Sequence, residues 1–117
     1  MHPDNLGNEE GVKNGEGTYL FSDGGKFTGT FTNGLATGRG TYTFKDGSEY
    51  VGEFELGKRN GKGVYTYSNN EIFEGEFKND QMESLGIFYL QNESTYTVEL
   101  ENGLPTGPGK LKFPDGR

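Results

Sequence analysis

From Gly17 onward, bulky apolar residues alternate with polar or small residues, and the alternation returns at regular intervals along the chain. A two-residue period of this kind predicts β-strands with one buried face. The first strand of each unit is expected at residues 19–21, 42–44, 65–67, 88–90 and 111–113. The second strand is expected at residues 27–31, 50–54, 73–77 and 96–100. The end positions of these segments form four columns, which hold fifteen of the sixteen aromatic residues. Leu fills the three remaining places, and only Tyr89 lies outside the columns.

Glycines repeat with a fixed spacing of 23 residues. A Gly-x-Gly motif stands at residues 15–17, 38–40, 61–63 and 107–109, and Ser84 replaces the first glycine at 84–86. A fixed period of this size indicates a repeat array. We expect an array over residues 11–117, preceded by a flexible lead-in over residues 1–10. The predicted repeats lie near residues 15–37, 38–60, 61–83 and 84–106, with a partial repeat at 107–117.

Turn residues indicate how the strands connect. Asp46-Gly47 tolerates the positive φ of hairpin turns, as do the corresponding dipeptides of other repeats. A three-residue loop with glycine in the left-handed conformation would pair Tyr42 with Tyr50 on one face, so this loop is predicted. The connectors between hairpins, such as residues 33–38, are too short for a crossover helix. The fold is therefore predicted to be all-β: an elongated, single-layer antiparallel meander of four to five hairpin repeats.

Gly29, Gly52 and Gly75 occupy the middle of the second strands. A glycine in a strand lets an aromatic ring lie over the backbone, and we expect a ring from the neighbouring strand to do so. Val98 takes this place in the fourth repeat, where it should lift or displace the ring. The chain stops inside a turn at Asp115-Gly116, so an unpaired edge, open to pairing with other strands, is expected there.

Residues 50–67 read Tyr-Val-Gly-Glu-Phe-Glu-Leu-Gly-Lys-Arg-Asn-Gly-Lys-Gly-Val-Tyr-Thr-Tyr and closely resemble the MORN motif, the membrane occupation and recognition nexus repeat. Residues 73–79 and 27–34 are similar, and the resemblance extends over residues 11–117. It implies an elongated solenoid of hairpins without catalytic residues. Members of this family are scaffolds in ciliary and cytoskeletal assemblies, at membrane junctions, and beside the catalytic domains of some lipid kinases and lysine methyltransferases. Known partners of similar arrays include helical peptides in the groove and other copies of the array.

Composition narrows the classes of partner. The formal net charge is −7 and the pI is near 4.7, which disfavours nucleic acid and direct binding to an anionic membrane. The chain has no cysteine, and its apolar runs reach only four or five residues, far short of a membrane-spanning helix. These features predict a cytoplasmic protein, with association with the cytoskeleton, a cilium or the periphery of a membrane as the alternatives.

No catalytic or metal-binding constellation is found in the sequence. His2 is the only histidine and lies in the lead-in. The Gly-x-Gly motifs do not continue to a phosphate-binding loop and do not open a helix. We therefore predict no enzyme activity, no catalytic residue, no metal site and no cofactor.

The candidate binding residues are aromatic and acidic. A single-layer sheet cannot bury both sides of its rings, so some rings are expected to stay partly open and to accept an apolar helix. These rings are Tyr42, Tyr50, Tyr65 and Phe73. By contrast, rings of neighbouring repeats are expected to stack into the core, above all Phe31, Phe54 and Phe77.

Carboxylates on the other face form the second candidate surface. Glu53, Glu74 and Glu76 are expected there, with Glu53, Glu76 and Glu99 stacked into an acidic row. Such a row either keeps a narrow sheet soluble or attracts a basic partner segment. Ile87 and Tyr89 make a further apolar spot on this face, which would mark a kink, a dimer contact or a partner site.

The sequence thus predicts a non-enzymatic interaction module or scaffold that presents an aromatic groove with acidic margins to a basic, amphipathic helix. One alternative is a self-assembling cytoskeletal or ciliary scaffold, in which copies pair through the groove or the sheet edge. Another is a targeting or regulatory domain of a larger enzyme, such as a lysine methyltransferase or a phosphoinositide kinase. Phospholipid binding is the least favoured alternative.

Overall fold

The computed structural model describes residues 14–116, and every regular element in this part of the chain is a β-strand. The expected lead-in over residues 1–10, including His2, lies outside the described residues. The strands are β1 (Gly15–Leu20), β2 (Lys26–Thr32), β3 (Leu35–Thr43), β4 (Glu49–Glu55), β5 (Lys58–Thr66), β6 (Ile72–Lys78), β7 (Gln81–Tyr89), β8 (Thr95–Glu101), β9 (Leu104–Pro105) and β10 (Lys110–Lys112).

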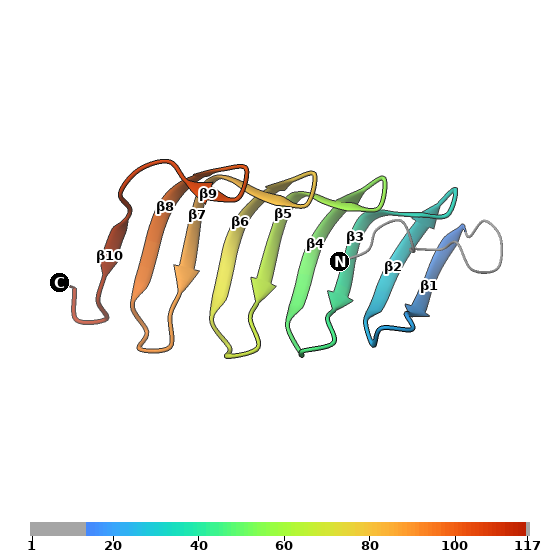
Figure 1. The fold of residues 1–117 in the computed structure, drawn as a ribbon, viewed down its shortest axis with the longest axis horizontal. Coiled ribbons are helices and arrows are strands. Elements are labelled where there is room, and N and C mark those ends of the chain that lie inside the picture. The colour runs from blue at the N-terminus through green and yellow to red at the C-terminus, as the bar shows by residue number, and fades with distance from the viewer. Residues whose placement is uncertain (1–13, 117) are drawn as a thin grey trace.

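These strands form one open antiparallel sheet in chain order from β1 to β8, after which β9 and β10 both pair with β8 (Figure 1). The sheet is a single layer with principal extents of 53 × 24 × 19 Å. The predicted all-β meander is therefore confirmed. It follows from the short connections, which place each of β1–β8 beside its neighbours in the chain.

One end of the sheet is built from the predicted three-residue turns. Tyr42 pairs with Tyr50, and the Phe44 backbone N–H donates to the Ser48 carbonyl at 2.8 Å. Gly47 closes the turn in the left-handed conformation, at φ 92°. The same position in the other described turns is also left-handed, and is held by Gly24, Asn70, Glu93 and Gly116. Loop length thus places the paired rings on one face, as predicted.

The opposite end of the sheet is built from two-residue turns. They are Asn33-Gly34, Leu56-Gly57, Asn79-Asp80 and Asn102-Gly103, and both residues of each turn have positive φ. This is the backbone of a type I′ hairpin, whose twist matches that of the flanking strands. The connector expected over residues 33–38 is therefore mostly strand, because β3 already begins at Leu35. A register shift between Thr28 and Thr30 absorbs the extra residues opposite them.

The core is a row of aromatic rings on one face of the sheet. Phe31, Phe54 and Phe77 are each 3% exposed, which confirms the predicted self-packing. Tyr50 meets Phe54 and Phe77 edge to face, with ring centroids 5.2 and 5.0 Å apart. Tyr50 therefore bridges two repeats, and so does Phe27, which contacts Phe31 and Phe54. Edge-to-face pairs of this kind contribute about 0.5–1.5 kcal/mol each beyond their buried area.

Glycine makes room for these rings. A Cβ added to Gly52 would lie 2.6 Å from the Tyr50 hydroxyl oxygen, and one added to Gly63 would meet the same ring. The ring over the Gly29, Gly52 and Gly75 column thus comes from the same strand, two residues earlier, and the expectation of a neighbouring strand is wrong. The neighbouring strand supplies the second glycine under the ring. Val98 replaces the glycine in the fourth repeat, where Tyr96 is half-buried and its ring still lies against the backbone of Gly109.

Candidate functional site

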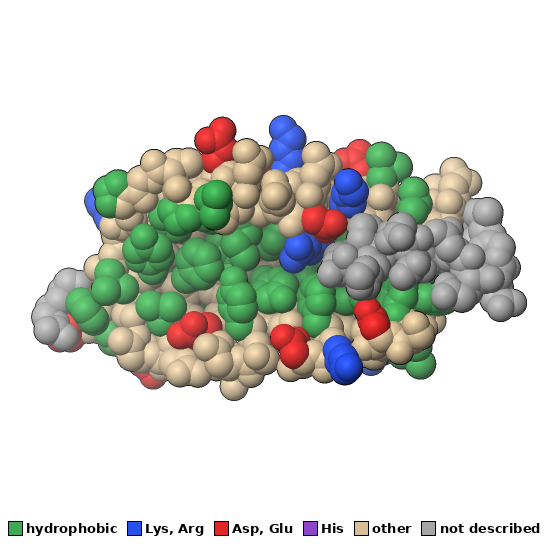
Figure 2. Space-filling view, in the orientation of Figure 1, with side chains coloured by type: hydrophobic (Ala, Val, Ile, Leu, Met, Phe, Trp, Pro, Cys, Tyr) green, Lys and Arg blue, Asp and Glu red, His purple; other side chains and the backbone are tan. Residues whose placement is uncertain are grey.

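The two faces of the sheet differ in chemistry. We call the face that carries the rings of Tyr50, Phe54 and their counterparts the aromatic face, and the other the opposite face. Figure 2 shows the apolar side chains as a band along the length of the molecule. The strands alternate side chains between the two faces, so a bound segment that lies on one face cannot touch the other.

Three of the four predicted contact rings are buried, so the expectation that they stay partly open is wrong. Tyr42 is 2% exposed, and Tyr50 and Phe73 are fully buried. A ring that lies over a glycine is covered on its outer side by an edge-to-face ring from the next repeat, as Phe77 covers Tyr50. A single-layer sheet can therefore bury both sides of such a ring. Tyr65 remains half-buried, and its hydroxyl lies 3.2 Å from the Ser48 hydroxyl.

The Tyr50 hydroxyl illustrates how this core accommodates polar atoms. It donates to the Glu53 carbonyl oxygen at 2.9 Å. Burial raises the pKa of Tyr50 to about 12, against the opposing effect of the nearby Arg59 guanidinium. Tyr50 is therefore neutral at physiological pH and acts as a core residue.

The aromatic face opens into a cavity of about 580 Å³ near the C-terminal end of the array. We call this cavity the C-terminal hollow. It is lined by Tyr67, Met82, Phe88, Leu90, Tyr96, Val98, Leu100, Gly103, Pro105 and Leu111. Its size lies within the roughly 300–1,000 Å³ that is typical of ligand pockets. The lining is almost entirely apolar, so the hollow suits an apolar group.

The hollow exists because aliphatic residues replace rings in the fourth repeat and after it. Leu90, Leu100 and Leu111 stand where the preceding repeat has Tyr67, Phe77 and Phe88, respectively. Leucine occupies less volume than an aromatic side chain, so space that rings fill in the preceding repeat stays open here.

Sequence reasoning missed this site, although its signal was visible. The three leucines are the only non-aromatic residues in the aromatic columns, and they were interpreted as substitutes for rings. A cavity depends on how much space the smaller side chains leave unfilled. The sequence pattern does not contain that quantity.

Arg59 is also part of the aromatic face. Its guanidinium carbon lies 5.0 Å from the ring centroid of Phe77, 5.7 Å from that of Tyr50 and 5.9 Å from that of Tyr65. Its Nε donates to Asp80 Oδ1 at 3.2 Å, and one Nη donates to the Asp80 carbonyl oxygen at 2.7 Å. The two side chains are 16% and 23% exposed, so the ion pair is mostly enclosed.

Acidic groups lie along both margins of the aromatic band, with basic groups among them (Figure 2). One of these margins is rich in carboxylates and also carries Lys45. This margin is formed by the three-residue turns (Figure 1), whose segments carry Asp23, Asp46, Glu71 and Glu93. Hydrogen bonds from the Ser48 hydroxyl and backbone N–H lower the pKa of Asp46, so its carboxylate stays charged. The carboxylates beside the aromatic band are therefore turn residues, and they differ from the predicted Glu53, Glu74 and Glu76.

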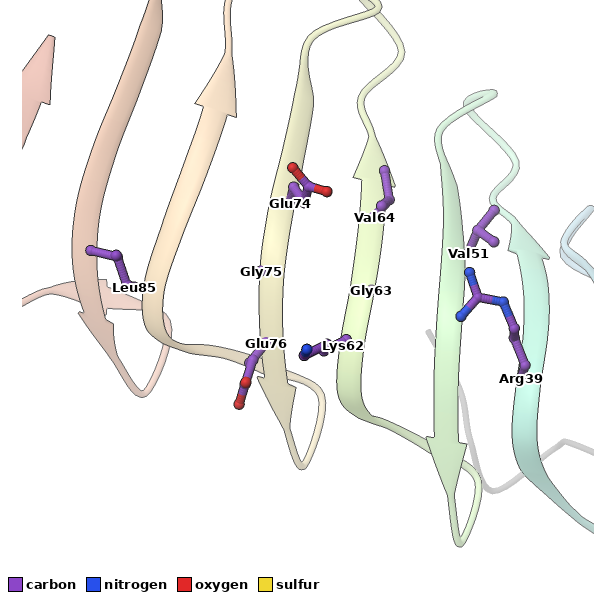
Figure 3. A pocket seen from close by; sticks show the side chains of 9 residues that line it. All are labelled: Arg39, Val51, Lys62, Gly63, Val64, Glu74, Gly75, Glu76 and Leu85. Carbon is purple, nitrogen blue, oxygen red and sulfur yellow. The ribbon is translucent and has the colours of Figure 1, made fainter.

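The three predicted glutamates lie on the opposite face. Glu74 and Glu76 line a second cavity, of about 450 Å³, together with Arg39, Lys62 and Leu85 (Figure 3). Because this cavity is behind the sheet, these glutamates do not border the aromatic groove. They are separated from Tyr42, Tyr50, Tyr65 and Phe73 by the sheet itself.

The predicted acidic row on the opposite face is interrupted by basic residues. Glu53 pairs in register with Arg39, and Glu76 pairs with Lys62. Arg39 and Lys62 thus offset the negative charge of Glu53 and Glu76 over β3–β6. The basic residues come from β3 and β5, which lie between the strands that carry the predicted row. On β7, by contrast, Glu83 lies opposite Glu76 and Leu85 lies opposite Glu99, so negative charge remains toward the C-terminal end.

The Ile87 and Tyr89 spot is partly polar in character. The Tyr89 hydroxyl donates to Glu74 Oε1 at 2.8 Å, and this hydrogen bond raises the pKa of Tyr89. Tyr89 is 38% exposed. Tyr89 therefore presents a hydroxyl bonded to a carboxylate, and the spot is not purely apolar.

No group of three metal-ligating side chains comes together among residues 14–116. Every buried side-chain polar atom in the described part of the chain has a hydrogen-bond partner. A search of the same residues for a helix able to cross a membrane finds none.

Comparison with known families identifies the repeat. A family model described as the MORN repeat matches residues 9–26, 27–49, 50–72, 73–95 and 99–116. Three of these stretches begin at residues 27, 50 and 73, so they follow the 23-residue period and start at the second strand of a hairpin. No curated protein sequence matches the chain.

Proposed function

Because the chain belongs to the MORN repeat family, whose non-catalytic repeats generally mediate interactions with proteins or membranes, we propose that it binds an amphipathic helix of a partner protein along its aromatic face. The observation that carries this proposal is the C-terminal hollow, an apolar cavity of about 580 Å³ that opens on that face. The protein acts as an interaction module, without chemistry of its own.

The dimensions of the sheet suit a helix. An α-helix with its side chains is about 10–12 Å across, and the sheet is 53 Å long with an intermediate extent of 24 Å. A helix that lies lengthwise can insert one or two apolar side chains into the hollow. Each fully buried Leu or Phe would contribute about 1.5–3 kcal/mol.

The charge of the aromatic band favours a basic flank on the partner helix. Asp23, Asp46, Glu71 and Glu93 belong to the turns along one margin, and the formal net charge is −7. A helix with Lys or Arg beside its apolar face would be steered toward this margin. Buried Tyr42, Tyr50 and Phe73 form the floor beneath it, and Tyr65 is the predicted ring that can contact it.

The same charge argues for a protein partner over an anionic bilayer. We place the interaction in the cytoplasm, at a cytoskeletal or ciliary assembly or at the periphery of a membrane. A second copy of the chain is an alternative occupant of the hollow. Sedimentation velocity over a range of concentrations distinguishes the two, because self-association alone would make the sedimentation coefficient depend on concentration.

The test is to fill the hollow without weakening the fold. Leu90→Tyr combined with Leu100→Phe restores the rings that preceding repeats carry at those positions. A displayed library of amphipathic helical peptides is selected on the unaltered protein, and the selected peptides are titrated by fluorescence anisotropy. We expect the double variant to bind at least about tenfold more weakly, the loss of one apolar anchor.

Leu20→Tyr is the matched control, since Leu20 lies outside the hollow and the corresponding residue three repeats later is Tyr89. This variant should bind like the unaltered protein, and thermal melts should show all three proteins folded. The proposal would be contradicted if the Leu90→Tyr, Leu100→Phe variant bound the peptides as tightly as the unaltered protein does. It would also be contradicted if no library member bound the unaltered protein.

A further inference from the structure

Arg59 is the one charged residue in the rows of β1–β8 that form the aromatic face. The other repeats carry Ala36, Met82 and Pro105 at the matching position. We propose that Arg59 selects partner helices that carry a carboxylate about two helical turns from the apolar residue that enters the hollow. This inference rests on the proposed function and specifies the chemistry of the partner.

The spacing follows from a chain of contacts. The Arg59 guanidinium carbon lies 5.0 Å from the Phe77 ring centroid. Phe77 is the cross-strand partner of Met82, which lines the hollow. Cross-strand neighbours are about 5 Å apart, so the guanidinium lies about 10 Å from the near wall of the hollow. A helix rises 1.5 Å per residue, so 10 Å corresponds to about seven residues, or two turns.

The guanidinium has donor capacity to spare. Asp80 accepts hydrogen bonds from Nε and from one Nη of Arg59. The second Nη forms no hydrogen bond among the described residues. Arginine is always charged and presents its donors in a planar fork that matches a carboxylate. The surrounding rings of Tyr50, Tyr65 and Phe77 reduce competition from water, which strengthens a charged hydrogen bond.

Arg59 also lies on the other side of the band from the acidic turns. It is the second residue of β5, directly after the two-residue turn at Leu56-Gly57, whereas the acidic groups belong to the three-residue turns. A helix in the band thus faces mostly carboxylates, with Lys45 among them, on the flank of the three-residue turns, and the Arg59–Asp80 pair on the other flank. The remaining donors of Arg59 favour one acidic residue on that side of the partner helix and basic residues on the opposite side.

The test compares paired peptides. From the selected library we take an apolar-anchored helix with Glu seven residues from the anchor and a version with Gln at that position. The unaltered protein should bind the Glu peptide about tenfold more tightly than the Gln peptide, as expected for a charged hydrogen bond. An isomer with the Glu moved to the solvent side of the helix should lose this preference.

The matched variant is Arg59→Met with Asp80→Asn. Methionine is the residue of the next repeat at this position, and the Asn avoids leaving a partly buried carboxylate without its cation. This variant should bind the Glu and Gln peptides equally and should remain folded in a thermal melt. Equal binding of the two peptides by the unaltered protein would overturn the role of Arg59 while leaving the groove intact. The absence of any peptide binding would instead overturn the proposed function and this inference with it.

Discussion

Leu56 stands in a conformation that leucine disfavours. It is the first residue of the two-residue turn between β4 and β5, at φ 52°. The three other turns of this type have asparagine at the same place, namely Asn33, Asn79 and Asn102. Asparagine tolerates the left-handed region because its short side chain can hydrogen-bond locally. Leu56→Asn should therefore stabilise the protein.

The expected gain can be estimated from two opposing effects. A left-handed residue with an ordinary side chain costs about 1–2 kcal/mol, and most of this cost is relieved by asparagine. Leu56 is 72% exposed, so the substitution sacrifices about a quarter of the roughly 2 kcal/mol that full burial of a leucine contributes, or about 0.5 kcal/mol. The net stabilisation is therefore about 0.5–1.5 kcal/mol.

Urea unfolding followed by far-ultraviolet circular dichroism measures this difference. The midpoint should rise while the slope stays constant, because the surface exposed on unfolding is unchanged. The melting temperature should rise by about 2–6 °C. The reciprocal control is Asn79→Leu in the next turn, which keeps the backbone N–H of residue 79 as donor to Asn60 Oδ1 and should destabilise by a similar amount.

An unchanged or lowered midpoint for Leu56→Asn would refute the reasoning. It would mean that Leu56 makes contacts that outweigh the conformational cost. A stabilised variant together with a neutral Asn79→Leu variant would locate the effect in the side chain, so the turn conformation would no longer explain it.

Three further predictions follow from the aromatic core and the surface charge. Gly63→Ala should destabilise the protein by about 1–3 kcal/mol in urea unfolding, because the added Cβ would meet the Tyr50 ring. The control is Gly17→Ala at the matching position of the edge strand, which has open space around it and should tolerate the Cβ with almost no loss of stability. Equal effects of the two substitutions would contradict the account in which the ring lies over the glycine. The free energy of unfolding should fall as the pH rises from 10 toward 12, because burial raises the pKa of Tyr50 to about 12 and the unfolded chain therefore loses this proton at lower pH than the folded protein does. Tyr50→Phe should flatten this decline. An unaltered decline in the variant would assign it to other groups. In a flotation assay with vesicles containing anionic lipid at physiological salt, the protein should stay unbound because of its net charge of −7, and co-flotation would contradict this.

Much of the fold was predictable because its information is local. The pairing of Tyr42 with Tyr50 follows from the number of residues in one turn and the left-handed tolerance of Gly47. The period of 23 residues repeats this local decision along the chain. The extra length of β3 was missed because the two-residue turn and the bulge after it look like a loop in the sequence.

The candidate site was less predictable. Burial of Tyr50 depends on Phe54 and Phe77 above it, and these contacts cross between repeats. The register also decided that Lys62 would stand beside Glu76. Sequence columns compare equivalent positions, whereas contacts form between positions that are not equivalent, so exposure and charge balance could not be read from the columns.

The sequence by itself determined the repeat, the strand alternation and the length of the three-residue turns, because each depends on a few neighbouring residues. Only the tertiary structure decided which rings are buried, where the leucines leave a hollow, and that Arg59 lies among the rings opposite the acidic turns. These features depend on how volumes and charges from different repeats fill a shared space. The outcome depends on the packing of all strands together, so no single stretch of sequence contains it.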